Sequence, residues 1–266
     1  MDTSIPAAVM PPLCYGHLQL TRTGFNPTVD DVIEARDILT DLGIGSRKIP
    51  IEIALMILSL GYYHPRQSSI KELEAIYEAD EFWRPGPEAS IAGLYLTAAT
   101  LSVPDTIARA KSITFQMKAA DQGWADFGGD GTYDNSHTWY ETSILRPQSE
   151  STATTIINTN MENFRTPGEA RDYLRSHGWD MVESNGTVVW RVHNNVTACR
   201  EYRHYRVDWV AGIPTEVDDP RAMGDGQGFL ELLRQDDVVT LWARAEQQAW
   251  VNKIQEATIE IEYEVL

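Results

Sequence analysis

Cysteine is scarce in this chain. Only Cys14 and Cys199 are present among 266 residues, too few for a disulfide framework or for a zinc site made of cysteines alone. Such a composition is typical of a reducing compartment, so we expect a cytoplasmic protein. The first ten residues have no basic region followed by a long apolar stretch, and we therefore predict no signal peptide.

Positive charge is also in short supply. The chain has 22 Lys and Arg residues against 39 Asp and Glu residues, a net charge of -17. Because such a field repels polyanions, nucleic acid and anionic membrane surfaces are excluded as partners. Long apolar runs are absent as well: the longest, residues 51–60, contains Glu52 and is too short to span a bilayer. These features predict a soluble protein.

The first hundred residues are predicted to form an N-terminal helical segment, residues 1–100. Thr28 followed by two aspartates is a helix start, and the apolar residues after it recur at helical spacing as far as Gly43. A second helix is predicted from Pro50 to the residue before Gly61. A short third helix is predicted from residue 68 to residue 77.

From residue 101 onward the pattern changes to short strands. Apolar and polar residues alternate with a period of two, which is typical of strands with one face in a core, at 112–117, 138–145, 186–192, 202–210, 241–245 and 257–263. Turn-forming residues separate these segments, and residues 147–170 are predicted to be a surface insertion. Residues 101–266 are therefore predicted to form an antiparallel β-sandwich of the jelly-roll, galactose-binding-like kind, in a mainly β protein.

Familiar catalytic motifs are missing. Residues 224–228 are rich in glycine, but no lysine is near them, so they are predicted to be a loop and not a phosphate cradle. The chain has no Gly-x-Ser-x-Gly elbow, and Cys199 has no identifiable base partner. Glu141 could belong to an acid–base pair, but its partner cannot be named from the sequence.

The sequence predicts no metal and no cofactor. None of the six histidines stands at a ligand spacing from another, although His193 and His204 could meet across neighbouring strands. One alternative stays open: four aspartates in the loop 121–135 could hold calcium, as in a glycan-binding jelly roll.

Aromatic residues interleaved with hydrogen-bond donors are the remaining signal. Rings and donors on one face of a sheet can hold a planar ligand that carries oxygens, although each ring could equally fill the core. The residues are Trp124, Tyr133, His137, Trp139, Tyr140, Trp190, Arg191, His193, Tyr202, Arg203, His204, Tyr205, Trp242 and Arg244.

Several of these stretches resemble a β-sandwich family of filamentous-fungal proteins that often carry an F-box-like segment. The sandwich motifs are Asp121–Trp124, Gly131–Trp139, Asn195–Ala198 leading to Trp209, Leu241–Ala245 and Trp250–Asn252. The segment from Ile49 through Tyr63–Arg66 is similar to the F-box-like helix and its tail, with His64 in place of a tryptophan. The architecture is also similar to the small fungal enzymes that catalyse hetero-Diels–Alder coupling in tropolone–sesquiterpene biosynthesis.

The resemblance implies a cofactor-free pericyclase acting on small polyketide and terpenoid molecules. A tropolone-derived ortho-quinone methide would couple to a humulene-type alkene. Arg203, His204 and Tyr205 would donate to the diene oxygen, and His137 or His193 would act as the acid that forms the quinone methide. The residues implied to bind substrate are Trp124, Trp139, Tyr140, Trp190, Arg191, Trp242 and Arg244.

Two other functions stay open at this stage. The resemblance also implies a ubiquitin-ligase adaptor that docks through its F-box-like helix, and the aspartate loop implies a glycan-binding module. The large β surface makes a homodimer possible.

Overall fold

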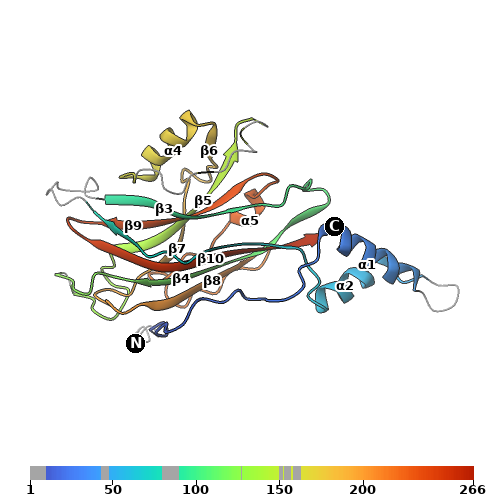
Figure 1. Cartoon of the computed structure of the whole chain (residues 1–266), viewed down its shortest axis with the longest axis horizontal. Coiled ribbons are helices and arrows are strands. Elements are labelled where there is room, and N and C mark those ends of the chain that lie inside the picture. The colour runs from blue at the N-terminus through green and yellow to red at the C-terminus, as the bar shows by residue number, and fades with distance from the viewer. Residues whose placement is uncertain are drawn as a thin grey trace, which may run out of the picture.

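Two antiparallel β-sheets stacked on each other form the body of the protein (Figure 1). The computed structural model describes residues 10–42, 48–79, 90–126, 128–149, 152, 157 and 163–266. It confirms the predicted mainly β, antiparallel sandwich with an N-terminal helical segment. The finer jelly-roll, galactose-binding-like description stays a prediction.

Each sheet has five strands. The first sheet runs in the order β1 (Arg66–Lys71), β10 (Val251–Val265), β4 (Ala108–Ala120) and β8 (Arg203–Val210), and β2 (Ala75–Glu78) also pairs with β10. The second runs in the order β3 (Ser90–Ala99), β9 (Val238–Glu246), β5 (Thr138–Pro147) and β6 (Trp179–Met181), and β7 (Trp190–Asn194) also pairs with β5.

The two predicted N-terminal helices are confirmed. In α1 (Val29–Asp41), the Thr28 side chain accepts from the Asp31 backbone N–H and the Asp31 carboxylate accepts from the Thr28 N–H, which satisfies free donors of the first turn. Helix α2 (Ile51–Leu60) follows Pro50. Together they form a hairpin that projects from one end of the sandwich (Figure 1). None of the helices in the described ranges is both long and apolar enough to cross a membrane.

The predicted helix at 68–77 is wrong. Residues 66–71 and 75–78 are strands β1 and β2, which pair with opposite halves of β10. Strand β3 also lies before residue 101 and pairs with β9. Within the described residues, the helices of the predicted 1–100 segment are therefore α1 and α2, and its remaining elements belong to the sheets. Residues 66–71 and 75–78 form strands because the backbone N–H and C=O groups along one edge of β10 need hydrogen-bond partners.

The core lies between the sheets. In β10, Ile259 and Ile261 are fully buried in it, as the period-two pattern predicts. Glu260, between them, was expected to be exposed, yet it is buried, as is Glu256 nearer the start of the strand. A segment before α1 covers them: the Leu18 N–H donates to Glu256 (2.9 Å) and the Thr21 N–H to Glu260 (3.0 Å).

The outer face of the second sheet is covered in part by α4 (Pro167–Ser176). Ala170 and Leu174 of this helix pack against apolar residues of β3, β5 and β9. Within the predicted surface insertion at 147–170, residues 150–151, 153–156 and 158–162 lie outside the described residues, and α4 begins before its end. A short helix, α5 (Phe229–Leu232), closes the core between the sheets. Its Phe229 packs against Trp190 and Trp209.

Candidate functional site

Four side chains meet on the outer face of the second sheet. Trp139 and Glu141 are two residues apart on β5 and share a face. The register places Trp139 opposite Arg244 of β9 and Glu141 opposite Arg191 of β7. We call Trp139, Glu141, Arg191 and Arg244 the arginine–tryptophan cluster. Three of its members are predicted substrate-binding residues, and strand pairing brings them together.

Glu141 is the centre of the cluster. Arg244 donates from Nη1 to one carboxylate oxygen over 2.7 Å, and the Trp139 indole N–H donates to the other over 2.7 Å. Arg191 Nη2 lies 3.8 Å from the carboxylate. The side chains of Glu141 and Arg244 are each 8% exposed. A buried carboxylate with these donors holds both guanidinium groups and the indole in fixed positions.

Both guanidinium groups lie beside the Trp139 ring. The Arg191 guanidinium carbon is 4.3 Å from the ring centroid and that of Arg244 is 5.2 Å from it. The Arg244 Nε donates to the Ile91 carbonyl over 3.0 Å, and Arg191 Nη1 donates to the Asn194 side chain over 2.6 Å. The two distances from the guanidinium carbons to the Trp139 ring centroid are typical of cation–π contacts.

Arg191 differs from Arg244 in its access to solvent. Its side chain is 38% exposed. Burial lowers the pKa of the Arg191 guanidinium, and Glu141 acts in the opposite direction. Arginine nevertheless stays protonated in water at neutral pH. The cluster therefore combines two cations with one carboxylate and presents an accessible, planar donor next to an indole, which suits an oxygen-bearing planar ligand.

Four other predicted substrate-binding residues are placed elsewhere. Tyr140 and Trp190 are buried in the core between the sheets, where Tyr140 donates to Asn252 (2.6 Å) and Trp190 to the Gln227 carbonyl (3.0 Å). Trp242 is buried in the apolar layer under α4. Trp124 is 52% exposed and packs against the Trp250 ring. The expectation that Tyr140, Trp190 and Trp242 line an open pocket is thus corrected, because the first sheet covers Tyr140 and Trp190 and α4 covers Trp242.

The three predicted donors of β8 do not converge. Tyr205 is buried in the core and its hydroxyl accepts from the Val196 N–H over 3.1 Å. Arg203 donates to Cys199 Sγ over 3.1 Å and to the Pro11 carbonyl over 2.6 Å. His204 lies on the opposite face, with Nε2 2.8 Å from Gln116 Oε1. Consecutive strand residues point to opposite faces, so this set was incompatible with one site.

Of the two predicted acids, His193 contacts the donor Tyr205, whereas His137 packs against Trp250. His193 is buried between the Tyr133 and Tyr205 rings, and its Nδ1 lies 2.6 Å from the Asn194 carbonyl. Burial lowers the pKa of His193 to about 4, so the ring is neutral at pH 7. His137 packs against the Trp250 ring, and burial lowers its pKa too. His193 does not meet His204, which corrects that expectation.

Two aspartates of the loop 121–135 bind other groups of the protein. Buried Asp121 accepts from the Thr138 hydroxyl (2.8 Å), the Ala198 N–H (2.8 Å) and the Trp250 indole (3.2 Å). Asp134 pairs with Arg221. These contacts occupy two of the four loop aspartates. Among the described residues the loop does not bring three possible metal ligands together, so it does not fit a calcium site.

One other group has the composition of a metal site. Within the described ranges, His17, Glu72 and Glu256 have potential ligand atoms within 4.8 Å of one another. Glu256 already accepts from the Leu18 N–H, and the Lys118 ammonium lies 3.4 Å from it. An ammonium group this close competes with a metal ion for the carboxylate.

A hollow of about 320 Å³ lies beside Trp209 of β8, in the first sheet. The turn after β8 and the glycine-rich loop at 225–228 form its walls, which confirms that these glycines belong to a loop. The hollow is lined by Asp225 and Glu231 without a Lys or Arg. A ligand rich in oxygen atoms therefore fits it less well than it fits the arginine–tryptophan cluster.

Sequence reasoning missed the role of Glu141 in this cluster. The alternation at 138–145 does place Glu141 on the face of Trp139, but its arginine partners come from strands far away in the chain. The buried amide of Asn252, which bonds to Tyr140, Asn195 and the Trp139 carbonyl, was missed as well. No local pattern marks such a residue.

Comparison with known proteins finds no matching family model and no matching curated protein. Among solved structures, a chain from "Structure of deformed wing virus carrying the GFP gene" is similar at 10% identity, with a TM-score of 0.22. The alignment covers 100% of this chain, which spans 56% of the viral chain. A TM-score this low says nothing about function, and the resemblance to fungal F-box-like and Diels–Alder proteins stays a prediction.

Proposed function

We propose that this protein is a cofactor-free pericyclase. It joins a tropolone-derived ortho-quinone methide to a humulene-type alkene by an inverse-electron-demand hetero-Diels–Alder reaction. One observation supports this most: the partly exposed guanidinium of Arg191 stands beside the Trp139 indole, and buried Glu141 fixes the cluster.

The reaction requires binding and polarisation more than acid–base chemistry. One C–C and one C–O bond form while the four π electrons of the enone and the two of the alkene reorganise, and no atom leaves. Holding both partners in a reactive geometry lowers the barrier by up to about 7–11 kcal/mol in favourable cases. A donor to the carbonyl oxygen withdraws electron density from the diene, and such a donor contributes about 3 kcal/mol.

In this proposal Arg191 is the donor, in place of the three β8 residues that lie apart. Its guanidinium presents parallel N–H groups, which match the adjacent oxygens of a tropolone. Arg244 and Glu141 are positioning residues, since both are buried and act on the ligand through Arg191 and Trp139.

The direct test incubates the purified protein with a hydroxymethyl-tropolone precursor and humulene. We expect one product enantiomer, formed faster than in buffer alone, as read by chiral chromatography. A racemic product at the background rate would contradict the proposal for this substrate pair.

The Arg191→Ala variant is expected to lower the enzymatic rate by about a hundredfold, because loss of one charge-stabilising donor costs about that much in other enzymes. Arg191→Lys keeps the charge but loses the planar pair of donors, so its rate should lie between the two. Arg206→Ala is the matched control, since Arg206 is an exposed arginine paired with Asp208 on the other sheet. Equal rates for Arg191→Ala and the control would show that Arg191 is not the donor in this reaction.

A further inference from the structure

Helix α2 carries apolar residues on nearly all sides, yet the described structure covers little of it. Its sequence is Ile-Glu-Ile-Ala-Leu-Met-Ile-Leu-Ser-Leu, and only Ala54 and Leu58 are buried. The side chains of Ile51, Ile53, Met56, Ile57 and Leu60 are between 42% and 78% exposed. Helices that are apolar all round are normally buried, and a continuous apolar patch of this kind marks a binding surface.

A groove runs between the two helices of the hairpin. It has a volume of about 410 Å³ and is lined by Ile38 and Leu39 of α1, Ile57 and Leu58 of α2, and Tyr63 beyond it. The hairpin projects from the sandwich, so the groove can be reached by another molecule (Figure 1). Its apolar lining suits the apolar face of a helix.

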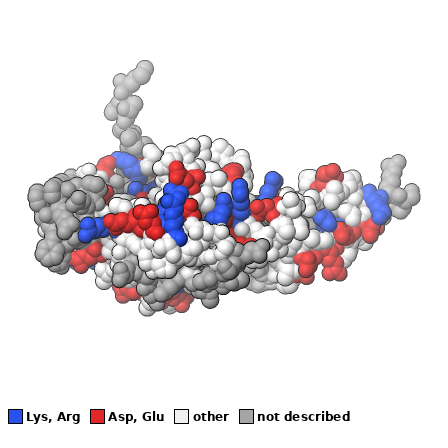
Figure 2. Space-filling model, turned by 90° about the horizontal axis from the view of Figure 1, so that it is seen from above, with Lys and Arg blue, Asp and Glu red and all other residues white. Residues whose placement is uncertain are grey.

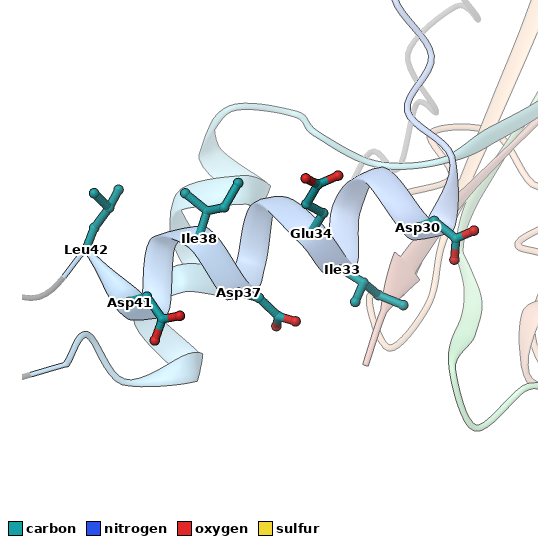
Figure 3. A pocket seen from close by; sticks show the side chains of 7 residues that line it. All are labelled: Asp30, Ile33, Glu34, Asp37, Ile38, Asp41 and Leu42. Atoms are coloured by element: carbon teal, nitrogen blue, oxygen red, sulfur yellow. The ribbon is translucent and has the colours of Figure 1, made fainter.

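An acidic hollow on α1 lies beside this groove, although no acidic side chain among the described residues lines the groove itself. Five of the six charged residues of α1 are acidic. Asp30, Glu34, Asp37 and Asp41 line the acidic hollow, and Ile38 belongs to both the hollow and the groove. Figure 3 shows Glu34 pointing to the same side of α1 as Ile38 and Leu42. Asp37 and Asp41 point away from that side and pair with Arg36 and Lys48, respectively. Figure 2 shows acidic side chains gathered over the hairpin, at the right of the view.

We propose that this groove binds an amphipathic helix of another protein, whose apolar face fills the groove and whose edge carries Lys or Arg residues. A second copy of this chain would bring another acidic α1 and a further net charge of -17, so like charges oppose self-association. An anionic membrane is repelled by the same acidic edge. The partner's basic residues would pair with the acids beside the groove, which sets its orientation.

The test uses three synthetic peptides of 18 residues each. One places leucines on one helical face and lysines along both edges, the second replaces each lysine with glutamate, and the third scrambles the first. Binding to the full chain is measured by fluorescence anisotropy at low and high salt. We expect saturable binding of the lysine peptide, weakened by salt, with no binding of the glutamate or scrambled peptide.

Two variants locate the binding surface. Ile57→Asp should weaken lysine-peptide binding by about tenfold or more, because it places a charge in the groove. Glu34→Lys should weaken it by about twofold or more, since an exposed charge pair contributes modestly. The matched controls on the sandwich are Leu73→Asp (Leu73 is 61% exposed) and Asp172→Lys, an exposed acid of α4, and neither should change binding.

Three results would overturn the proposal. Equal binding of the lysine and glutamate peptides would show apolar adhesion without charge recognition. Equal losses in the groove variants and the sandwich controls would show attraction by the whole acidic surface. A dimer in analytical ultracentrifugation that Ile57→Asp dissociates would assign the groove to a second copy of the chain.

Discussion

The Glu141→Leu variant is expected to lower the free energy of unfolding by about 3–5 kcal/mol, because it leaves the buried Arg244 guanidinium without its carboxylate. Arg244 loses its 2.7 Å bond and Trp139 loses the acceptor of its indole N–H. Equilibrium unfolding in urea, followed by tryptophan fluorescence, measures the change.

The double variant Glu141→Leu/Arg244→Met removes both charges together. We expect it to recover most of the lost stability, since replacing a buried ion pair with apolar residues of similar size is often neutral. If the double variant is no more stable than Glu141→Leu, then Arg244 is not the residue that needs Glu141.

The same double variant separates stability from activity. Under the proposed function, a protein restored in stability should still lose most of its cycloaddition rate, because Trp139 and Arg191 are no longer held in place. Full activity in the double variant would leave the ion pair with a purely structural role.

Acidification from pH 6.5 to pH 4 is expected to destabilise the protein, with about 3 kcal/mol coming from His193 alone. Burial lowers the pKa of His193 to about 4 in the folded state, whereas the unfolded chain has the ordinary value near 6.5. The unfolded state therefore binds more protons in this window. The contribution of His193 is fully present above pH 6.5 and is lost as the pH falls toward 4.

Urea unfolding at pH 7, 5.5 and 4 gives the size of this effect. Burial lowers the pKa of His64, His137 and His204 in the same direction, whereas burial raises the pKa of Asp121, which has the opposite effect. The His193→Gln variant isolates the contribution of His193 to the free energy of unfolding. On acidification it should lose less stability than the unchanged protein. Parallel pH profiles for the two proteins would show that His193 is not buried as a neutral ring.

The residues at 138–145 illustrate how far the sequence alone reaches. Their alternation correctly predicts a strand and places Trp139 opposite in direction to Tyr140. It does not say which of the two faces the core, because the second sheet is covered on one face by the first sheet and on part of the other by α4. The partners of Glu141 come from β7 and β9, about fifty and a hundred residues away, and only strand register brings them together.

The sequence by itself determined the elements with a local cause: helix α1 through its capping box, the end of α2 at Gly61, and the strands through their period of two. The tertiary structure alone decided that residues 66–71 and 75–78 are strands and that Glu256 and Glu260 of β10 are buried. It also decided that Arg191 and Arg244 share Glu141. These outcomes depend on contacts between segments far apart in the chain, and no local pattern encodes which segments will meet.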